Sequence, residues 1–237
     1  AVLVGGEAID ISLWIQLANL DPIKFYNVYG PTECTVDTTI KLITKEDKNP
    51  TIGSPIPNVQ TYVLDEDLEP VPVGVAGELF IGGAGVATGY LNRPNMTTEK
   101  FIPNHFSNTP GERLYRSGDI VRFNQSGELE FQGRIDNQIK IRGFRVELEE
   151  IESRISDHKQ VISNVVVARE DTPGVQRLIA YIATSSDKRF SDEIRKQLSE
   201  SLPDFMIPSI FIFMEELPLN QHGKVDKSKL PIPTDED

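Results

Sequence analysis

The hydrophobic pattern of the chain changes near Asp136, and this change constrains the fold more than any other feature. Before Asp136, short apolar runs with β-branched and aromatic residues occupy positions 61–64 and 78–81. A segment with several Pro and Gly residues at 70–77 separates them, which is typical of the turns between strands. The first part of the chain therefore predicts a β-meander or a barrel-like unit.

After Asp136 the pattern is that of a small α+β domain. Apolar residues recur at helical spacing in two places, at Leu148, Ile151 and Ile155 and again at Ile194, Leu198 and Leu202. Apolar runs predict strands at 165–168, 178–183 and 210–214. Ser191 is expected to cap the second helix, and Pro203 is expected to end it.

The first residues, AVLVGGEAI, have the pattern of a buried strand that enters a Gly-Gly turn. A buried parallel strand needs sheet neighbours, so we expect this chain to be one piece of a larger domain. The predicted fold class is α/β and α+β. Residues 1–135 form the β-rich part of a large domain, and residues 136–237 form a small α+β domain.

Composition excludes several classes of function. The chain has 237 residues, of which 38% are hydrophobic and 25% charged, and it contains no apolar run near the roughly 20 residues of a membrane span. Its formal net charge of -12 disfavours nonspecific binding to nucleic acid. The single cysteine, Cys34, allows no internal disulfide, so a reducing compartment such as the cytoplasm is expected. The three histidines lack the close spacing of metal ligands.

Asp119 and Arg134 are candidates for a ribose site. Asp119 lies in a Ser-Gly-Asp turn, where its carboxylate can accept two hydroxyl hydrogen bonds, and Arg134 follows after a strand-length interval. The alternative is a surface hairpin in which the two side chains only cap turns.

Six ordered motifs favour the ribose site over the surface hairpin, because together they resemble a known family. They are VGGEAI, NVYGPTE, GELFIGGAGVATGYLNRPNMTTEKF, YRSGDIVR, GRIDNQIKIRGFRVELEEIE and LPLNQHGKVDKSKL. In this order they resemble the adenylate-forming enzymes, and most closely the amino-acid adenylation domains of nonribosomal peptide synthetases. The resemblance covers nearly the whole chain. It implies that residues 1–135 are the C-terminal part of the large adenylation subdomain and residues 136–237 the small mobile subdomain.

In the resembled family, a carboxylate oxygen of an amino acid attacks the α-phosphate of ATP, pyrophosphate leaves, and an aminoacyl-adenylate stays bound. The resemblance gives Thr32 a phosphate contact and makes Glu33 a Mg2+ ligand. Tyr29 would stack against adenine, while Gly30 and Gly6 would allow close approach of the backbone to the nucleotide. The alternative for this motif is a turn and helix cap with Pro at a permitted position.

The resemblance also assigns Asp119 to the ribose, Arg134 as its companion and Phe131 beside the nucleotide. An aromatic residue on a strand is equally well explained by core packing. Lys224 would be the catalytic lysine, whose charge bridges the substrate carboxylate and the phosphate in the adenylation step. Without the motif, a lysine in a polar loop is simply solvated surface.

Asp136 matches the family's hinge, about which the small subdomain presents either Lys224 or the thiolation loop around Gly143. The incoming thiol would be that of phosphopantetheine on a downstream peptidyl carrier domain. Lys140, Arg142 and Arg145 form a solvated basic face or help to dock that carrier.

Five positions match the residues that line the family's amino-acid pocket, and they are Leu3, Gly5, Val28, Val36 and Asp37. The set resembles domains that activate glutamine or glutamate. A buried Asp37 prefers hydrogen-bond donors, so we favour glutamine, because glutamate would require a compensating cation.

The chain departs from the family pattern in one respect. It contains no Ser/Thr/Gly-rich, Lys-containing phosphate loop, so we expect an N-terminal half of the adenylation domain to be a necessary partner. Two alternatives stay open. One is a piece of an acyl-CoA or aryl-CoA ligase, and the other is a noncatalytic fragment that docks a carrier domain.

Overall fold

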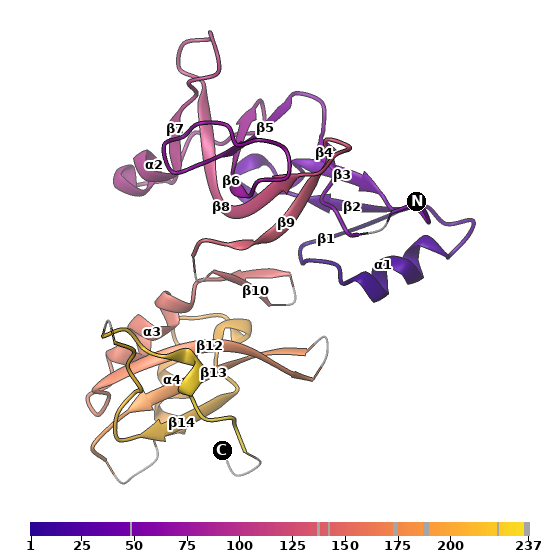
Figure 1. The fold of residues 1–237 in the computed structure, drawn as a ribbon. Coiled ribbons are helices and arrows are strands. Elements are labelled where there is room, and N and C mark those ends of the chain that lie inside the picture. The colour runs from indigo at the N-terminus through magenta and orange to yellow at the C-terminus, as the bar shows by residue number, and fades with distance from the viewer. Residues whose placement is uncertain are drawn as a thin grey trace. The chain divides into compact units, whose positions relative to one another are not determined.

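The computed structural model describes residues 1–47, 49–136, 138–141, 143–172, 175–186, 190–221 and 223–234. The chain divides into two compact units, Ala1–Asp136 and Asn137–Asp237 (Figure 1). Each unit has its own hydrophobic core. In the part of the chain that the structure describes, no helix is long and apolar enough to cross a membrane.

The first unit begins with a four-stranded sheet of order β1-β2-β3-β4. Its strands are β1 (Val2–Gly5), β2 (Phe25–Tyr29), β3 (Thr39–Leu42) and β4 (Ser54–Pro55). β1 and β2 are parallel and are connected by helix α1 (Ile11–Ala18). The Asp10 carboxylate accepts the first free N–H groups of this helix, those of Ser12 and Leu13. Trp14 of α1 is fully buried beside Phe25, so the helix covers one face of the sheet.

A second, antiparallel sheet has the order β5-β6-β8-β7, with β9 also paired to β8. Its elements are β5 (Val59–Leu64), β6 (Gly77–Gly83), α2 (Pro94–Lys100), β7 (Phe101–Pro103), β8 (Arg113–Phe123) and β9 (Leu129–Arg134). The sequence runs expected to form strands lie inside β5 and β6, which confirms the β-rich first part. Leu79 and Ile81 of β6 are fully buried in the core of this sheet.

Residues 51–53 join the two sheets of the first unit. The N–H of Ile52 donates to the carbonyl of Leu129 at 2.8 Å, and the N–H of Leu129 donates to the carbonyl of Gly53 at 2.8 Å. Lys41 of β3 adds an ion pair of 2.7 Å to Glu128, next to the start of β9. These contacts join β3 and the segment after it to the start of β9.

The second unit is α+β, as the sequence predicts. A hairpin of β10 (Ile139–Ile141) and β11 (Phe144–Val146) precedes a three-stranded sheet and two helices, which are α3 (Leu148–Ser156), β12 (Ser163–Thr172), β13 (Val175–Ala183), α4 (Ser191–Ser199) and β14 (Ile210–Met214). The sheet order is β12-β13-β14, with β13 and β14 parallel. Successive residues of a strand face opposite sides, so Val166 packs with Ile151 of α3, whereas Val165 packs with Ile212 on the other face.

The expected role of Ser191 is wrong. Ser191 is the first residue of α4, the preceding Phe190 occupies the cap position, and among the described residues no side chain caps the helix there. Phe190 is buried against the core of the second unit. Hydrophobic anchoring therefore fixes this helix start, which a search for polar caps does not detect.

Candidate functional site

Asp119 is the centre of a buried polar cluster in the first unit. Its side chain is 8% exposed, and Arg134 Nη1 donates to its Oδ1 at 2.5 Å. The hydroxyl of Tyr29, at the end of β2, donates to Oδ2. Asp119 and Arg134 are opposite each other in the β8–β9 pairing. The fold thus brings together three residues that the sequence analysis selected from separate motifs.

Arg134 connects this cluster to Asp136. Its Nε and Nη2 each donate to Asp136 at 2.7 Å, and Nη2 also donates to the carbonyl of Ser117 at 3.0 Å. Burial alone would lower the pKa of Arg134, but the hydrogen bonds to Asp136 and the charge of Asp119 outweigh it and raise the pKa. The guanidinium therefore stays charged. It is shared between the residue expected to bind ribose and the residue expected to act as the hinge.

Tyr29 acts as a hydrogen-bond donor in this cluster. Burial, followed by the negative charge of Asp119, raises the pKa of the Tyr29 phenol well above its ordinary value. The hydroxyl is therefore protonated at neutral pH. The motif predicts only ring stacking for Tyr29, and it does not predict the hydrogen bond to Asp119.

Gly118 makes room for the guanidinium. Its φ is +76°, and a Cβ added there would lie 2.8 Å from Nη2 of Arg134 and 3.0 Å from Oδ2 of Asp136. Any other residue would be strained in this backbone conformation and would displace the ion pair. The Ser-Gly-Asp sequence indicates this arrangement, because a Gly next to a functional carboxylate often marks a place where another group approaches the backbone closely.

Glu33 lies in a second buried position of the same unit. It belongs to a short 3-10 helix, Thr32–Cys34, in which Thr32 is exposed and Glu33 is buried. The hydroxyl of Tyr90 donates to Glu33 Oε1 at 2.5 Å, and the N–H of Ala87 donates to the carbonyl of Glu33 at 2.8 Å. Tyr90 was not among the expected site residues, although it lies inside the matched motif GYLNRP. Among the described residues, no three His, Cys, Asp or Glu side chains form a metal-binding group.

The backbone after Glu33 is strained. Thr35 and Val36 have φ of 62° and 71°, in the left-handed region that β-branched residues rarely adopt. Gly30 accommodates this turn, because a Cβ on Gly30 would lie 2.1 Å from the carbonyl oxygen of Val36. The close approach seen at Gly30 is thus to the protein's own chain.

The residues expected to line the amino-acid pocket gather at one edge of the first sheet. Gly5 ends β1 opposite Val28 of the parallel strand β2, and Val36 and Asp37 lie in the loop after β2. Leu3, within β1, is 61% exposed and Val36 is 66% exposed. Ligands of α/β proteins bind outside the carboxyl ends of parallel strands, which is where this loop lies.

Two further expected residues of the first unit differ in their surroundings. Gly6 follows β1 with a φ of 96° and is exposed at the same sheet edge. Phe131 is half-buried and packs against the hydrophobic core around β6 and β8. The structure therefore gives Phe131 the packing contact that was its alternative interpretation.

Lys224 belongs to a hairpin loop in the second unit. The N–H of Asn220 donates to the carbonyl of Lys224 at 2.8 Å, the N–H of Lys224 donates to Asn220 Oδ1 at 3.1 Å, and Leu219 pairs with Val225. Gly223 adopts a φ of 76° at the turn. Lys224 is exposed. Asn220 and Lys224 are thus joined by two hydrogen bonds, and the Lys224 side chain is exposed to solvent.

The loop around Gly143 is the turn between β10 and β11. Gly143 is exposed with a φ of 80°, and the neighbouring Phe144 stacks on Phe205 with 4.3 Å between ring centres. Lys140 and Arg145 are paired across the hairpin. Arg142, the third residue of the expected basic face, lies outside the described residues.

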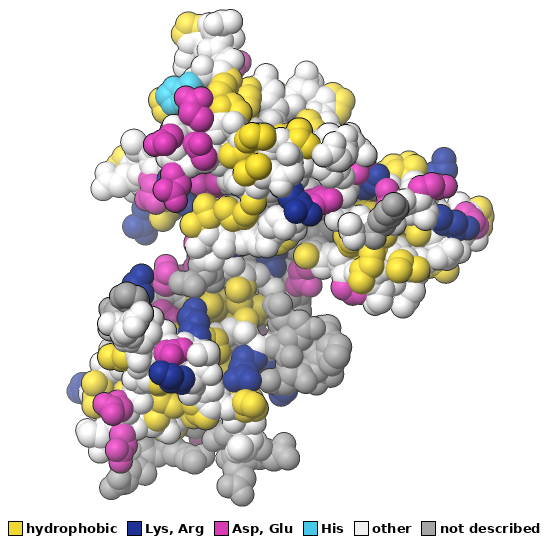
Figure 2. Space-filling view, in the orientation of Figure 1, with side chains coloured by type: hydrophobic (Ala, Val, Ile, Leu, Met, Phe, Trp, Pro, Cys, Tyr) yellow, Lys and Arg dark blue, Asp and Glu magenta, His cyan; other side chains and the backbone are white. Residues whose placement is uncertain are grey.

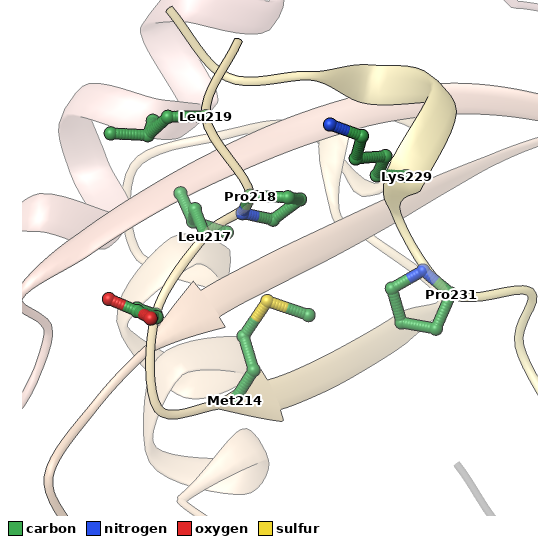
Figure 3. Close-up of a pocket in the computed structure, with 7 residues that line it drawn as sticks. Met214, Leu217, Pro218, Leu219, Lys229 and Pro231 are labelled. Carbon is green, nitrogen blue, oxygen red and sulfur yellow. The ribbon is translucent and has the colours of Figure 1, made fainter. Parts of the chain in front are cut away.

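A groove of about 510 Å³ lies close to the Lys224 hairpin in the second unit (Figure 3). Its labelled residues come from the end of β14, the segment after it and the C-terminal segment, and they are Met214, Leu217, Pro218, Leu219, Lys229 and Pro231. Because residues from three segments form this groove, no local sequence pattern indicates it.

The chain matches known proteins along most of its length. Residues 1–91 match the family described as AMP-binding enzyme, and residues 150–224 match the AMP-binding enzyme C-terminal domain. The sequence is 52% identical over 238 residues to a linear gramicidin synthase polypeptide of Brevibacillus parabrevis, a match that covers 98% of this chain and 4% of that protein. It is 45% identical over 239 residues to a dimodular nonribosomal peptide synthase of Bacillus subtilis, covering 98% of this chain and 10% of that protein.

Two solved structures have similar folds. Holo-PA1221, described as an NRPS protein containing adenylation and PCP domains bound to a vinylsulfonamide inhibitor, matches with a TM-score of 0.82 at 30% identity, over 95% of this chain and 39% of that one. The Vibrio cholerae adenylation domain AlmE, in complex with glycyl-adenosine-5'-phosphate, matches with a TM-score of 0.81 at 29% identity, over 94% and 43%. The chain thus spans less than half of each. It belongs to the AMP-binding enzymes and corresponds to part of an amino-acid adenylation domain of the nonribosomal peptide synthetase type.

Proposed function

We propose that this chain is part of an enzyme that activates an amino acid with ATP and passes the activated acyl group to a phosphopantetheine thiol in nonribosomal peptide synthesis. The observation that carries the proposal is the convergence of Tyr29, Asp119 and Arg134, from three separate motifs, in one buried hydrogen-bonded cluster. A carboxylate that accepts hydrogen bonds from a phenol and from a guanidinium is fixed in its orientation. It is then suited to accept hydrogen bonds from a pair of ribose hydroxyls.

The adenylation step forms a bond between a carboxylate oxygen of the amino acid and the α-phosphorus of ATP. The bond from that phosphorus to the bridging oxygen breaks, and pyrophosphate leaves with the electron pair. Negative charge accumulates during this step, so a fixed cation lowers its barrier. We assign this role to Lys224, whose exposed ammonium group is presented by a hydrogen-bonded hairpin. Thr32, exposed at the start of its short helix, would contact the phosphates.

Glu33 fits a Mg2+ ion that is shared with the substrate. Mg2+ is commonly held by one or two carboxylates together with substrate phosphates and water, and not by a full set of protein ligands. Glu33 supplies one hard carboxylate, which the Tyr90 hydroxyl orients at 2.5 Å. When bound, the ion would neutralise phosphate charge, and the protein would contribute the orientation of this carboxylate.

Transfer to the carrier would follow a reorientation about Asp136. The thiolate sulfur attacks the acyl carbon, a thioester forms, and AMP leaves with its phosphate oxygen. We propose a peptidyl carrier domain as the partner, with phosphopantetheine as its bound group. The PA1221 structure contains adenylation and PCP domains, which supports this proposal. The loop at Gly143 and the basic side chains of its hairpin would meet the carrier.

We favour glutamine as the substrate, with glutamate next. Asp37 lies at the same sheet edge as Leu3, Gly5, Val28 and Val36, where a side-chain amide could donate to it. We propose that the protein works in the cytoplasm. ATP is available there, and a chain with a single cysteine needs no oxidising compartment for a disulfide.

The N-terminal half of an adenylation domain is the other proposed partner. Apolar side chains are exposed on the part of the first unit that carries α1 (Figure 2), and Ile15 there is 52% exposed. Exposed apolar residues gathered on one face indicate a surface that another segment covers.

The test is amino-acid-dependent exchange of labelled pyrophosphate into ATP. The chain is assayed alone, and again with the N-terminal part of the gramicidin synthase adenylation domain that it resembles, each beside Lys224→Ala. We expect glutamine-dependent exchange in the supplemented mixture and a loss of at least a hundredfold with Lys224→Ala. No exchange with any amino acid in a reassembled complex would contradict the proposal. It would favour the acyl-CoA ligase, to be tested with fatty and aromatic acids, or the carrier-docking fragment.

A further inference from the structure

The strand that carries Asp119 is interrupted by a bulge. Glu78 pairs with Ile120 and Phe80 pairs with Arg116, so the three residues at 117–119 of β8 lie opposite Leu79 alone. A β-bulge turns a side chain away from the regular direction of its strand, and bulges are frequent beside active sites. Here the bulge directs Asp119 towards Tyr29 and Arg134.

The backbone groups of the bulge need partners outside the regular ladder, because buried N–H groups without an acceptor are costly. Ser117 supplies part of this need, since its Oγ accepts the N–H of Asp119 at 3.0 Å and donates to the carbonyl of Leu79 at 2.7 Å. The N–H of Gly118 donates to the side chain of Glu78 at 3.1 Å. Glu78 is therefore the acceptor for the residue directly before Asp119.

Glu78 is itself held rigidly. It is 7% exposed, both of its oxygens accept from Arg116 Nε at 3.0 Å, and Arg116 Nη2 lies 2.9 Å from Oε2. A buried carboxylate is stable only with a cation and hydrogen-bond donors, and Arg116 and the Gly118 amide provide these. The hydrogen bond to Glu78 also raises the pKa of Arg116.

We propose that Glu78 is a positioning residue for nucleotide binding. It does not touch the nucleotide but fixes the bulge that presents the Asp119 carboxylate to the ribose. The inference rests on the proposed ribose role of Asp119.

Replacement of Glu78 separates this role from general stability. Glu78→Ala leaves the Gly118 N–H without its acceptor, so we expect the KM for ATP to rise at least tenfold. The KM for the amino acid and the kcat of this variant should stay within twofold of the values for the unchanged protein. Glu78→Gln keeps an oxygen that can accept from Gly118, and we expect its KM for ATP within threefold of the unchanged protein.

Glu130→Ala is the matched control. Glu130 is also a carboxylate paired with an arginine of β8, with 2.7 Å between Oε2 and Nε of Arg122, and its side chain is 14% exposed. It lies beyond the bulge, in the pairing of β8 with β9. We expect the KM for ATP of Glu130→Ala to stay within twofold of that of the unchanged protein. Equal effects of Glu78→Ala and Glu130→Ala, or no effect of either, would overturn the inference.

Hydrogen exchange in the chain alone tests the bulge without any enzymatic activity. NMR should show that the Gly118 and Asp119 amides exchange at least tenfold faster in Glu78→Ala, with amides of β5 unchanged, and that Glu130→Ala leaves both amides as they are. If the unchanged protein lacked pyrophosphate exchange even when reassembled with the N-terminal half, the proposed function would fail while this result still stood. If the two amides kept their protection in Glu78→Ala, the positioning role would fail even in an active enzyme.

Discussion

At the scale of single residues, Tyr29 combines a proposed contact with an observed one. The motif assigns its ring to adenine stacking, and the structure adds a hydrogen bond from its hydroxyl to Asp119. Phenylalanine keeps the ring and removes the hydroxyl, so the two contributions can be separated.

We expect Tyr29→Phe to raise the KM for ATP at least tenfold, because hydrogen bonds to charged groups contribute about 1.5–3 kcal/mol and one partner is lost. The measurement is pyrophosphate exchange at varied ATP in the supplemented protein. Tyr26→Phe, in the same strand, is the control. An unchanged KM would show that stacking is the whole contribution of Tyr29.

Cys34 provides a second residue-scale prediction. It is 1% exposed, and burial, followed by the charge of Glu33, raises the pKa of its thiol to about 12. Since the thiolate is the reactive form, its fraction at pH 8 is reduced roughly a thousandfold relative to a free thiol.

We therefore expect iodoacetamide to modify the folded chain at pH 8 at least a thousandfold more slowly than the chain unfolded in urea. Cys34 is the only cysteine, so mass spectrometry reports on it alone. Rapid modification of the folded protein would mean that Cys34 is accessible and ionised.

At the scale of elements, the amphipathic helices hold the second unit together. Ile151 of α3 is fully buried, and it packs with Val166 of β12 and Ile194 of α4 in one cluster. The helix buries this face because Leu148, Ile151 and Ile155 recur at helical spacing.

We expect Ile151→Ala to lower the free energy of unfolding of the second unit by about 2–5 kcal/mol, the cost of a large-to-small change in a packed core. Urea denaturation of the variant measures this loss. Glu150→Ala, at the neighbouring exposed position of the same helix, should change it by less than about 0.5 kcal/mol. Equal losses for both variants would contradict the packing described here.

At the scale of the entire chain, the exposed apolar surface around α1 is where we propose that the N-terminal half of the adenylation domain packs. Ile15 is exposed there, whereas Trp14, one residue before it, is fully buried. A hydrophobic position exposed in the chain but covered in an assembled domain tolerates a charge before assembly and not after it.

We expect Ile15→Glu to fold normally, as judged by circular dichroism, and to lose pyrophosphate exchange with the supplied N-terminal half by at least tenfold. Ile162→Glu is the matched control, because Ile162 is 68% exposed and lies in the second unit. Exchange equal to that of the unchanged protein would place the N-terminal half elsewhere.

Much of the fold could be predicted from local pattern. The apolar runs at 61–64, 78–81 and 165–168 lie in strands, and the residues with helical spacing around Ile151 lie in helix α3. The start of α4 could not be predicted, because Phe190 anchors it by burial and not by a polar cap. The polar residues that support the site were missed for a similar reason. Glu78 and Tyr90 lie far in sequence from the groups they contact.

Local sequence pattern was sufficient for the strands at 61–64 and 78–81 and for the main strands and helices of the second unit, and ordered motifs were sufficient for the family, because periodicity, turn chemistry and motifs are local properties. The folded chain was needed to show that Tyr29 and Arg134 share the Asp119 carboxylate, and that a bulge held by Glu78 directs it. These contacts depend on strand register and on how two sheets join. Register is fixed by the burial of whole faces and not by any single segment.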